Sequence, residues 1–296
     1  MQYRKIWLAA SELASQFPSP SCTASYPCYN WRVFLSDKDI RIVLVRPRNP
    51  LNIGAAARAI QNFGFEDLVL VSPHDPIWRE SKAAPGAEVI LRNARVVPQL
   101  LDAIEDRTLV IGTSSLSRRS VSQPVISLDQ LSALWTRQRD NNRVAVVFGS
   151  EKTGLSRKDL SYCHWIVRIP TIPDCPSMNL GQAVAVCCYE LRKLAITKIV
   201  GIRNHRLQPF QSSGAQSLPN ATEPGMAANP LAAVGEVERL LNEIEQIVSG
   251  TAEPARGTER ARKTKLRRLL LRLPLTRQDL ILVLGVLRDL SFQLKR

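Results

Sequence analysis

One stretch of the sequence comes within a single residue of a nucleotide-binding loop. An apolar run, VAVVF, ends at Phe148 and is followed by GSEKTGLS over residues 149–156. A phosphate-binding loop has the pattern G-x-x-x-x-G-K-[ST] after a strand, and its lysine neutralises the β- and γ-phosphates. Leu155 occupies the position of that lysine, so we expect no ATP or GTP hydrolysis. What remains is Gly149, where backbone can approach a ligand closely, and Glu151, an acid near the start of a helix.

A second group of polar residues opens the segment IGAAARAIQNFG, residues 53–64. Asn52 precedes this helical pattern and is a favourable N-cap, and Arg58 follows six residues later. A helix N-terminus favours anions, and a nearby arginine could clamp a phosphate. Taken alone, the group is equally well explained by a capped helix with a solvated arginine.

The third group lies in PDCPSMNLGQAV, residues 173–184. Ser177 is a plausible N-cap, and Met178 and Asn179 open a long helical pattern. Ser177 and Asn179 could point polar groups at the edge of a sheet, although capping alone also explains them.

Five apolar runs of strand length alternate with helical patterns and position these groups. The runs read as buried on both faces, which favours a parallel sheet in an α/β layer structure. Ligands of such sheets bind beyond the carboxyl ends of the strands. The expected strands are 40–45, 68–72, 108–115, 144–148 and 165–169; the expected helices are 53–64, 98–106, 127–138 and 178–197; the loops at the carboxyl ends are 46–54, 112–118, 149–155 and 170–179.

The C-terminal part of the chain differs in composition. Residues 204–229 are rich in Ser, Gln, Pro and Gly, which is typical of a flexible linker, and only helical patterns follow. Pro230 suits a first helical turn, and Thr276 with Asp279 has the form of a capping box. Eight basic residues and one acid between 256 and 272 make a plausible RNA contact or a solvated helix face.

The overall charge points to a polyanionic partner, since 40 Lys and Arg oppose 26 Asp and Glu, a net charge of +14. The six cysteines form no CxxC pair, and with three scattered histidines they complete no zinc spacing, so we expect free thiols, no metal and a cytoplasmic protein. The apolar run 280–287 is too short to cross a membrane. Residues 1–38 fit a disordered extension, a transit peptide or an early start codon.

NIGAAAR, FGSEKTGL and SMNLGQAVAVCCYEL, in this order, resemble the three signature motifs of the SpoU/TrmH family of RNA ribose 2′-O-methyltransferases, in the SPOUT superfamily. The resemblance covers roughly residues 39–200. A helical extension after the catalytic domain is similar to the TrmJ-like subgroup. The implied domains are an N-terminal extension 1–38, a methyltransferase domain 39–200, a linker 201–229, and a helical RNA-binding or dimerisation domain 230–296.

The resemblance implies an α/β fold whose parallel sheet is threaded into a trefoil knot, and a homodimer formed through the knot region. It implies S-adenosylmethionine (SAM) as methyl donor, bound by Thr113, Ser114, Ser115, Gly149, Ile169, Ser177, Met178, Asn179 and Leu180. Met178 stands where we expect leucine, an apolar exchange of similar volume.

The implied reaction is methyl transfer to a ribose 2′-hydroxyl of tRNA, at nucleotide 32 of the anticodon loop. Alternatives are ribosomal RNA as substrate, or a non-catalytic RNA-binding homologue. Arg58 would bind the target phosphate and help to activate the hydroxyl, since a guanidinium stays protonated. Asn52 and Glu151 would hold its loop, and Ser177 and Asn179 would order the pocket and the substrate. The loop RPRNPLN, residues 46–52, is richer in Pro and Arg than the subgroup leads us to expect, which leaves the RNA target open.

Overall fold

The computed structural model describes residues 40–81, 83–115, 121, 123–131, 143–200, 231–249 and 258–294. All of them belong to one compact unit, Ser36–Arg296. The N-terminal extension 1–38 and the linker 201–229 inferred from the sequence lie outside the described residues.

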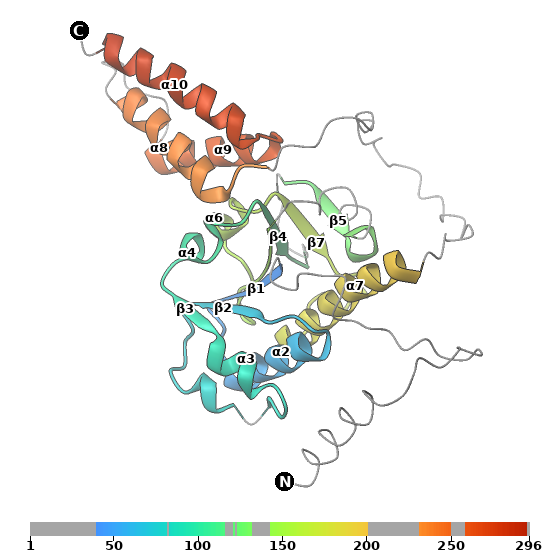
Figure 1. The fold of residues 1–296 in the computed structure, drawn as a ribbon. Coiled ribbons are helices and arrows are strands. Elements are labelled where there is room, and N and C mark those ends of the chain that lie inside the picture. The colour runs from blue at the N-terminus through green and yellow to red at the C-terminus, as the bar shows by residue number, and fades with distance from the viewer. Residues whose placement is uncertain are drawn as a thin grey trace, which may run out of the picture. The chain divides into compact units, whose positions relative to one another are not determined.

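A parallel sheet of seven strands forms the centre of the fold (Figure 1), in the order β3-β2-β1-β6-β4-β7-β5. The α/β class and the parallel pairing predicted from the sequence are confirmed. The short strands β3 and β5 were missed, because three partly exposed residues make too short an apolar run. The strands are β1 (Ile40–Val45), β2 (Asp67–Val71), β3 (Arg95–Val97), β4 (Leu109–Thr113), β5 (Val125–Ser127), β6 (Val144–Phe148) and β7 (Trp165–Arg168).

Helices cover both faces of the sheet, which explains why the strands are apolar throughout. On β1, Ile42 and Leu44 pack into one core while Val43 and Val45 pack into the other, the alternation of a strand. The first core includes residues of α2 (Pro50–Asn62), α3 (Glu88–Asn93) and α7 (Leu180–Val200); the second includes residues of α4 (Leu100–Ile104) and α6 (Arg157–Leu160), on the other side of the sheet (Figure 1).

Two helix starts differ from the sequence prediction. Helix α2 begins at Pro50 with Asn49 as its N-cap, whose Oδ1 accepts the Leu51 N–H at 2.9 Å. Asn52 therefore lies inside the first turn, with its side chain free for another role. Helix α7 is capped by Asn179 rather than Ser177, since Asn179 Oδ1 accepts the Gly181 N–H at 2.9 Å.

Other boundaries follow the sequence more closely. Gly64, with φ of 73°, follows α2 in the left-handed conformation in which glycine ends many helices. The helix expected over 127–138 is described only at its start, as a 3-10 turn over Leu128–Gln130, and residues 132–142 lie outside the described residues.

Three helices follow the linker: α8 (Val234–Ser249), α9 (Glu259–Arg272) and α10 (Arg277–Leu294). The capping box before α10 is confirmed, with Thr276 N–H donating to Asp279 at 2.8 Å. At the start of α8, the Val234 N–H donates to the Arg107 carbonyl at 2.9 Å. Arg267 of α9 is buried, where its guanidinium pairs with Glu238 of α8.

Candidate functional site

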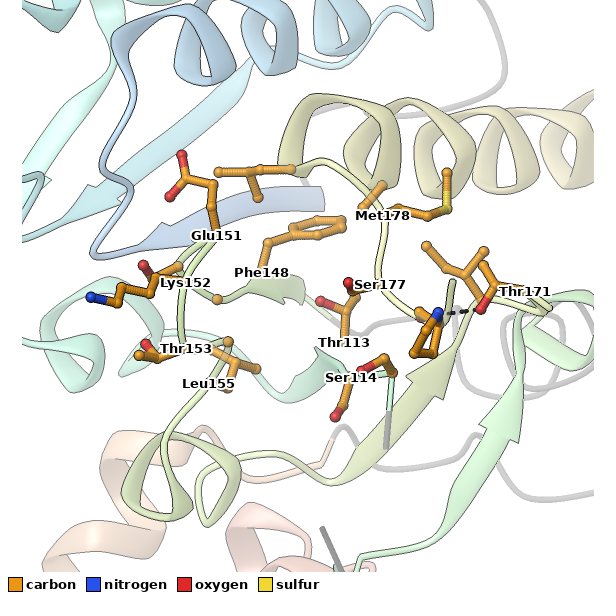
Figure 2. Close-up of a pocket in the computed structure, with 18 of the residues that line it drawn as sticks. Thr113, Ser114, Phe148, Glu151, Lys152, Thr153, Leu155, Thr171, Ser177 and Met178 are labelled. Atoms are coloured by element: carbon orange, nitrogen blue, oxygen red, sulfur yellow. Dashed lines mark hydrogen bonds between the residues drawn. The ribbon is translucent and has the colours of Figure 1, made fainter. Parts of the chain in front are cut away.

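A cavity of about 630 Å³ lies at the carboxyl ends of β4, β6 and β7 (Figure 2). This is the edge at which parallel α/β sheets bind ligands. Of the residues predicted to hold the cofactor, all except Asn179 line it. Its lining includes Thr113, Ser114, Ser115, Gly149, Ile169, Ser177, Met178 and Leu180, together with Phe148, Glu151, Lys152 and Thr171.

Gly149 is required by the fold of its own loop. A Cβ atom at Gly149 would lie 2.2 Å from the carbonyl carbon of Gly154 and 2.2 Å from the nitrogen of Leu155. The loop folds back on itself, with the Gly154 N–H donating to the Ser150 carbonyl at 2.7 Å. Leu155 is 2% exposed and packs in the second core. Leu155, at the position of the P-loop lysine, is thus a core residue. Any side chain at position 149 would collide with Gly154 and Leu155 and open the turn.

Glu151 ties this loop to the loop after β1. Its carboxylate accepts the N–H groups of Arg48 at 2.9 Å and Asn49 at 3.2 Å, and the side-chain amide of Asn52 at 2.8 Å. Burial on its own would raise the pKa of Glu151, but the hydrogen bonds from Asn52 and the backbone outweigh it and hold the pKa below its usual value. Glu151 is therefore an ionised acceptor whose role is to hold the first loop.

Asn52 connects Glu151 to the third loop. Its Oδ1 accepts from Asn179 Nδ2 at 2.8 Å, while Asn179 Oδ1 caps α7. Each of the two amides thus uses both its donor and its acceptor end. Glu151, Asn52 and Asn179 form one chain of hydrogen bonds that joins three motifs far apart in the sequence, and we call it the amide chain.

Arg58 lies apart from the amide chain. It is exposed on α2, and neither it nor Asn52 nor Asn179 lines the cavity. Among the described residues it has no hydrogen-bond or ion-pair partner, so its guanidinium is available to a ligand. Gly54, four residues earlier, allows close packing, since a Cβ there would meet the Ser81 side chain at 2.3 Å.

Sequence reasoning missed a second tie between the first two loops. Arg46, directly after β1, has a φ of 52° and its guanidinium reaches the buried Asp159 of α6, with Nη1 at 3.4 Å from Oδ1. Asp159 also accepts the Ser156 N–H at 2.7 Å. Burial would raise the pKa of Asp159, but the hydrogen bonds from Arg46 and Ser156 keep it low. Only the positive φ of a non-glycine residue marks this position as unusual, and φ is invisible in a sequence.

No group of three or more His, Cys, Asp or Glu residues suited to a metal occurs within the described ranges. Cys163, Cys175, Cys187 and Cys188 are free thiols, while Cys22 and Cys28 lie outside those ranges. No helix in the described part of the chain is long and apolar enough to cross a bilayer.

Comparison with known proteins defines the class to which this fold and site belong. The SpoU rRNA Methylase family matches residues 39–189. The chain is 31% identical over 256 residues to the tRNA (cytidine/uridine-2'-O-)-methyltransferase TrmJ of Yersinia enterocolitica, covering 86% of this chain and 92% of the relative. It is 39% identical over 158 residues to an uncharacterized tRNA/rRNA methyltransferase of Haemophilus influenzae, covering 52% of this chain and 63% of the relative.

A solved structure shows the same fold over most of the chain. The crystal structure of TrmJ from Z. mobilis ZM4 superposes with a TM-score of 0.67 at 30% identity, covering 85% of this chain and 98% of that one. The chain therefore belongs to the SpoU methylase family. It is a methyltransferase of a SAM-dependent family, as the three motifs predicted.

Proposed function

We propose that this chain is a SAM-dependent tRNA 2′-O-ribose methyltransferase that acts at nucleotide 32, a cytidine or uridine of the anticodon loop. The observation that carries the proposal is the amide chain, which gathers the three motif loops beside a cavity at the carboxyl ends of the strands. Relatives that span most of the chain carry names of tRNA cytidine/uridine 2′-O-methyltransferases, which supports tRNA as the substrate.

The cavity suits SAM. Phe148, Ile169 and Leu180 provide apolar surface for an adenine ring, while Thr113 and Ser177 add hydroxyl groups. A loop folded around Gly149 presents backbone polar groups at the same place. SAM supplies a methyl group already activated on a sulfonium, so the protein has mainly to align donor and acceptor.

The residues around the cavity divide the remaining work. Arg58 binds the phosphate beside the target ribose and helps to polarise the 2′-hydroxyl, since an arginine stays protonated at neutral pH. Glu151 and Asn52 hold the loop from which α2 starts, because their polar atoms are already used within the amide chain. Ser177 and Asn179 order the third loop and its substrate.

We also propose a homodimer through the trefoil-knotted region, as the resemblance implies. Arg58 lies outside the cavity lining of its own chain, so a partner that covers this side would bring RNA, Arg58 and cofactor together. Exposed apolar side chains on α2 and α7 support such a surface: Leu51 and Tyr189 are each 54% exposed.

We propose the domain layout that the sequence implied, with a methyltransferase domain over 39–200 and helices after 230 that contact RNA or dimerise. Not every basic residue of α9 is free to do so. Arg262 pairs with Glu245, and Arg267 pairs with Glu238. The exposed cations Arg260, Lys265 and Arg272 therefore carry the RNA-contact proposal for α9.

Methyl transfer from labelled SAM tests the proposal. We expect transfer to unmodified tRNA, and a loss of about 10²-fold or more in Arg58→Ala, because positioning at the target is lost. Arg92→Ala on α3 is the control and should keep its activity. An equal rate in wild type and Arg58→Ala would show that Arg58 has no such role.

A ribosomal RNA substrate is the second candidate, favoured by the description of the family that matches residues 39–189. An rRNA fragment assayed beside tRNA separates the two: label in the rRNA alone would replace our proposal with this one. A protein that binds RNA but transfers no methyl to either would be a non-catalytic homologue.

A further inference from the structure

The two motif loops tied together by Glu151 and Arg46 carry an uneven set of charges. Over residues 46–54 and 149–160 there are five cations and two acids. Both acids are already engaged: Glu151 accepts from the first loop, and Asp159 pairs with Arg46. The other four cations are therefore not neutralised by the acids of their own loops.

These four cations are Arg48, Lys152, Arg157 and Lys158, which we call the site rim. All four are exposed, and among the described residues their side chains have no hydrogen-bond or ion-pair partner. They are also close to the site. The Arg48 N–H donates to Glu151 at 2.9 Å, Lys152 is the next residue and lines the cavity, and α6 with Arg157 and Lys158 is joined to the first loop through Asp159.

Elsewhere in the described structure, several arginines are matched to carboxylates. Arg41 and Arg107 share Asp67 and Asp106, and Arg267 pairs with Glu238. These three arginines are buried and paired within the fold, whereas the four rim cations are exposed. Exposed cations left without acids next to a cavity raise the local potential toward a polyanion.

We propose that the site rim contacts the phosphate backbone of the RNA substrate and so presents the target nucleotide to the cavity, in addition to Arg58 and α9. This deepens the proposed function. Phosphate contacts set the position of a nucleic acid without reading its sequence. The rim residues are therefore predicted to govern RNA affinity and its salt dependence.

The experiment measures tRNA binding by the full chain against salt concentration. Two double variants test the rim, Arg48→Gln with Lys152→Gln, and Arg157→Gln with Lys158→Gln. Arg92→Gln with Arg95→Gln, on α3 and β3, removes two exposed cations elsewhere and serves as the matched control. Each lost phosphate contact lowers the slope of log K against log salt by about one, so each rim variant should lose about two and the control none.

A slope that stays at the wild-type value in both rim variants would overturn the proposal, as would an equal decrease in the control. Thermal unfolding of each variant verifies that it is folded. Wild-type methyl transfer to the same tRNA keeps the two ideas apart. Methylation with unchanged slopes would refute the rim alone, whereas reduced slopes without methylation would support the rim and refute the methyltransferase proposal.

Discussion

The two ends of the parallel strands use charge in opposite ways. At the amino ends, Arg41 donates to Asp67 at 2.7 Å, to Asp106 at 2.7 Å and to the Ala103 carbonyl at 2.8 Å. Arg107 lies 3.0 Å from Asp106 and joins the same network. Burial would raise the pKa of Asp106, but Arg107 and Arg41 outweigh it and lower this pKa.

At the carboxyl ends, Glu151 accepts hydrogen bonds from loop backbone and an amide, and several cations face water. Glu151 has taken three such donors, while the nearby Arg48 and Lys152 are exposed. At the amino ends the charges neutralise one another, whereas at the carboxyl ends exposed cations are left to face a ligand. We infer that the amino ends supply stability and that the carboxyl ends bind ligands, and variants at the two ends should separate these properties.

The largest expected effect lies at the amino ends. Arg41→Met keeps the volume of the side chain but removes a buried guanidinium from between Asp67 and Asp106, beside which Arg107 remains. We expect a loss of about 3 kcal/mol in the free energy of unfolding, because one cation then has to neutralise two acids at a partly buried site. Urea denaturation measures it, and methyl transfer per folded molecule should be retained. Arg95→Met, half-exposed and 3.9 Å from Asp67, is the control and should lose under about 1 kcal/mol.

The second effect belongs to the carboxyl ends. In Glu151→Gln, the side-chain amide faces the N–H groups of Arg48 and Asn49. Only its oxygen can accept a hydrogen bond from them, whereas the carboxylate accepts with both oxygens. We expect methyl transfer to decrease by about 10²-fold as the first loop moves, with little change in unfolding. Glu190→Gln, an acid that accepts from Lys193 on α7, is the control. Unchanged transfer in Glu151→Gln would contradict our reading of this residue.

Much of this division could be predicted from the sequence. Apolar runs without alternation gave the long parallel strands, and three motifs named Asn52, Glu151 and Asn179. The partners of these residues could not be predicted. Asn52 and Glu151 are separated by 99 residues and Arg46 and Asp159 by 113, so only the folded sheet brings them together.

The sequence also placed the start of α2 at the wrong residue. Asn52 has the residue type of an N-cap, but Pro50 suits the first helical turn and moves the cap to Asn49. In α9, the basic run suggested a wholly exposed face. The acids that pair with part of it, Glu245 and Glu238, lie in α8, and the sequence does not show that α8 and α9 pack together.

The third effect is a pH dependence at the amino end of β7. His164 accepts the Val110 N–H on Nδ1 at 3.0 Å, and burial lowers its pKa from 6.5 to about 4. Because the folded pKa is the lower one, the stabilisation is complete above about pH 6.5 and is lost as the pH falls toward 4. The imidazole keeps some contact with solvent, so we expect about 1–2 kcal/mol from unfolding measured across this range. If His164→Asn kept the same pH dependence, another group would be responsible.

The smallest effect distinguishes two candidates for the cap of α7. Asn179→Ala should lower the free energy of unfolding by about 1 kcal/mol, because it removes the cap. It should also slow methyl transfer by about tenfold, since Asn52 loses its support. Ser177→Ala should leave unfolding unchanged. The opposite ranking in thermal unfolding would restore Ser177 as the cap.

The central claim is that the site at the carboxyl ends of the strands methylates a ribose of tRNA. Mass spectrometry of an unmodified tRNA transcript, incubated with the protein and SAM, tests it most directly. We predict a single 2′-O-methyl group at nucleotide 32, present with wild type and Arg95→Met and strongly reduced with Glu151→Gln. A transcript without a 2′-O-methyl group, under conditions in which the protein binds SAM, would contradict the claim.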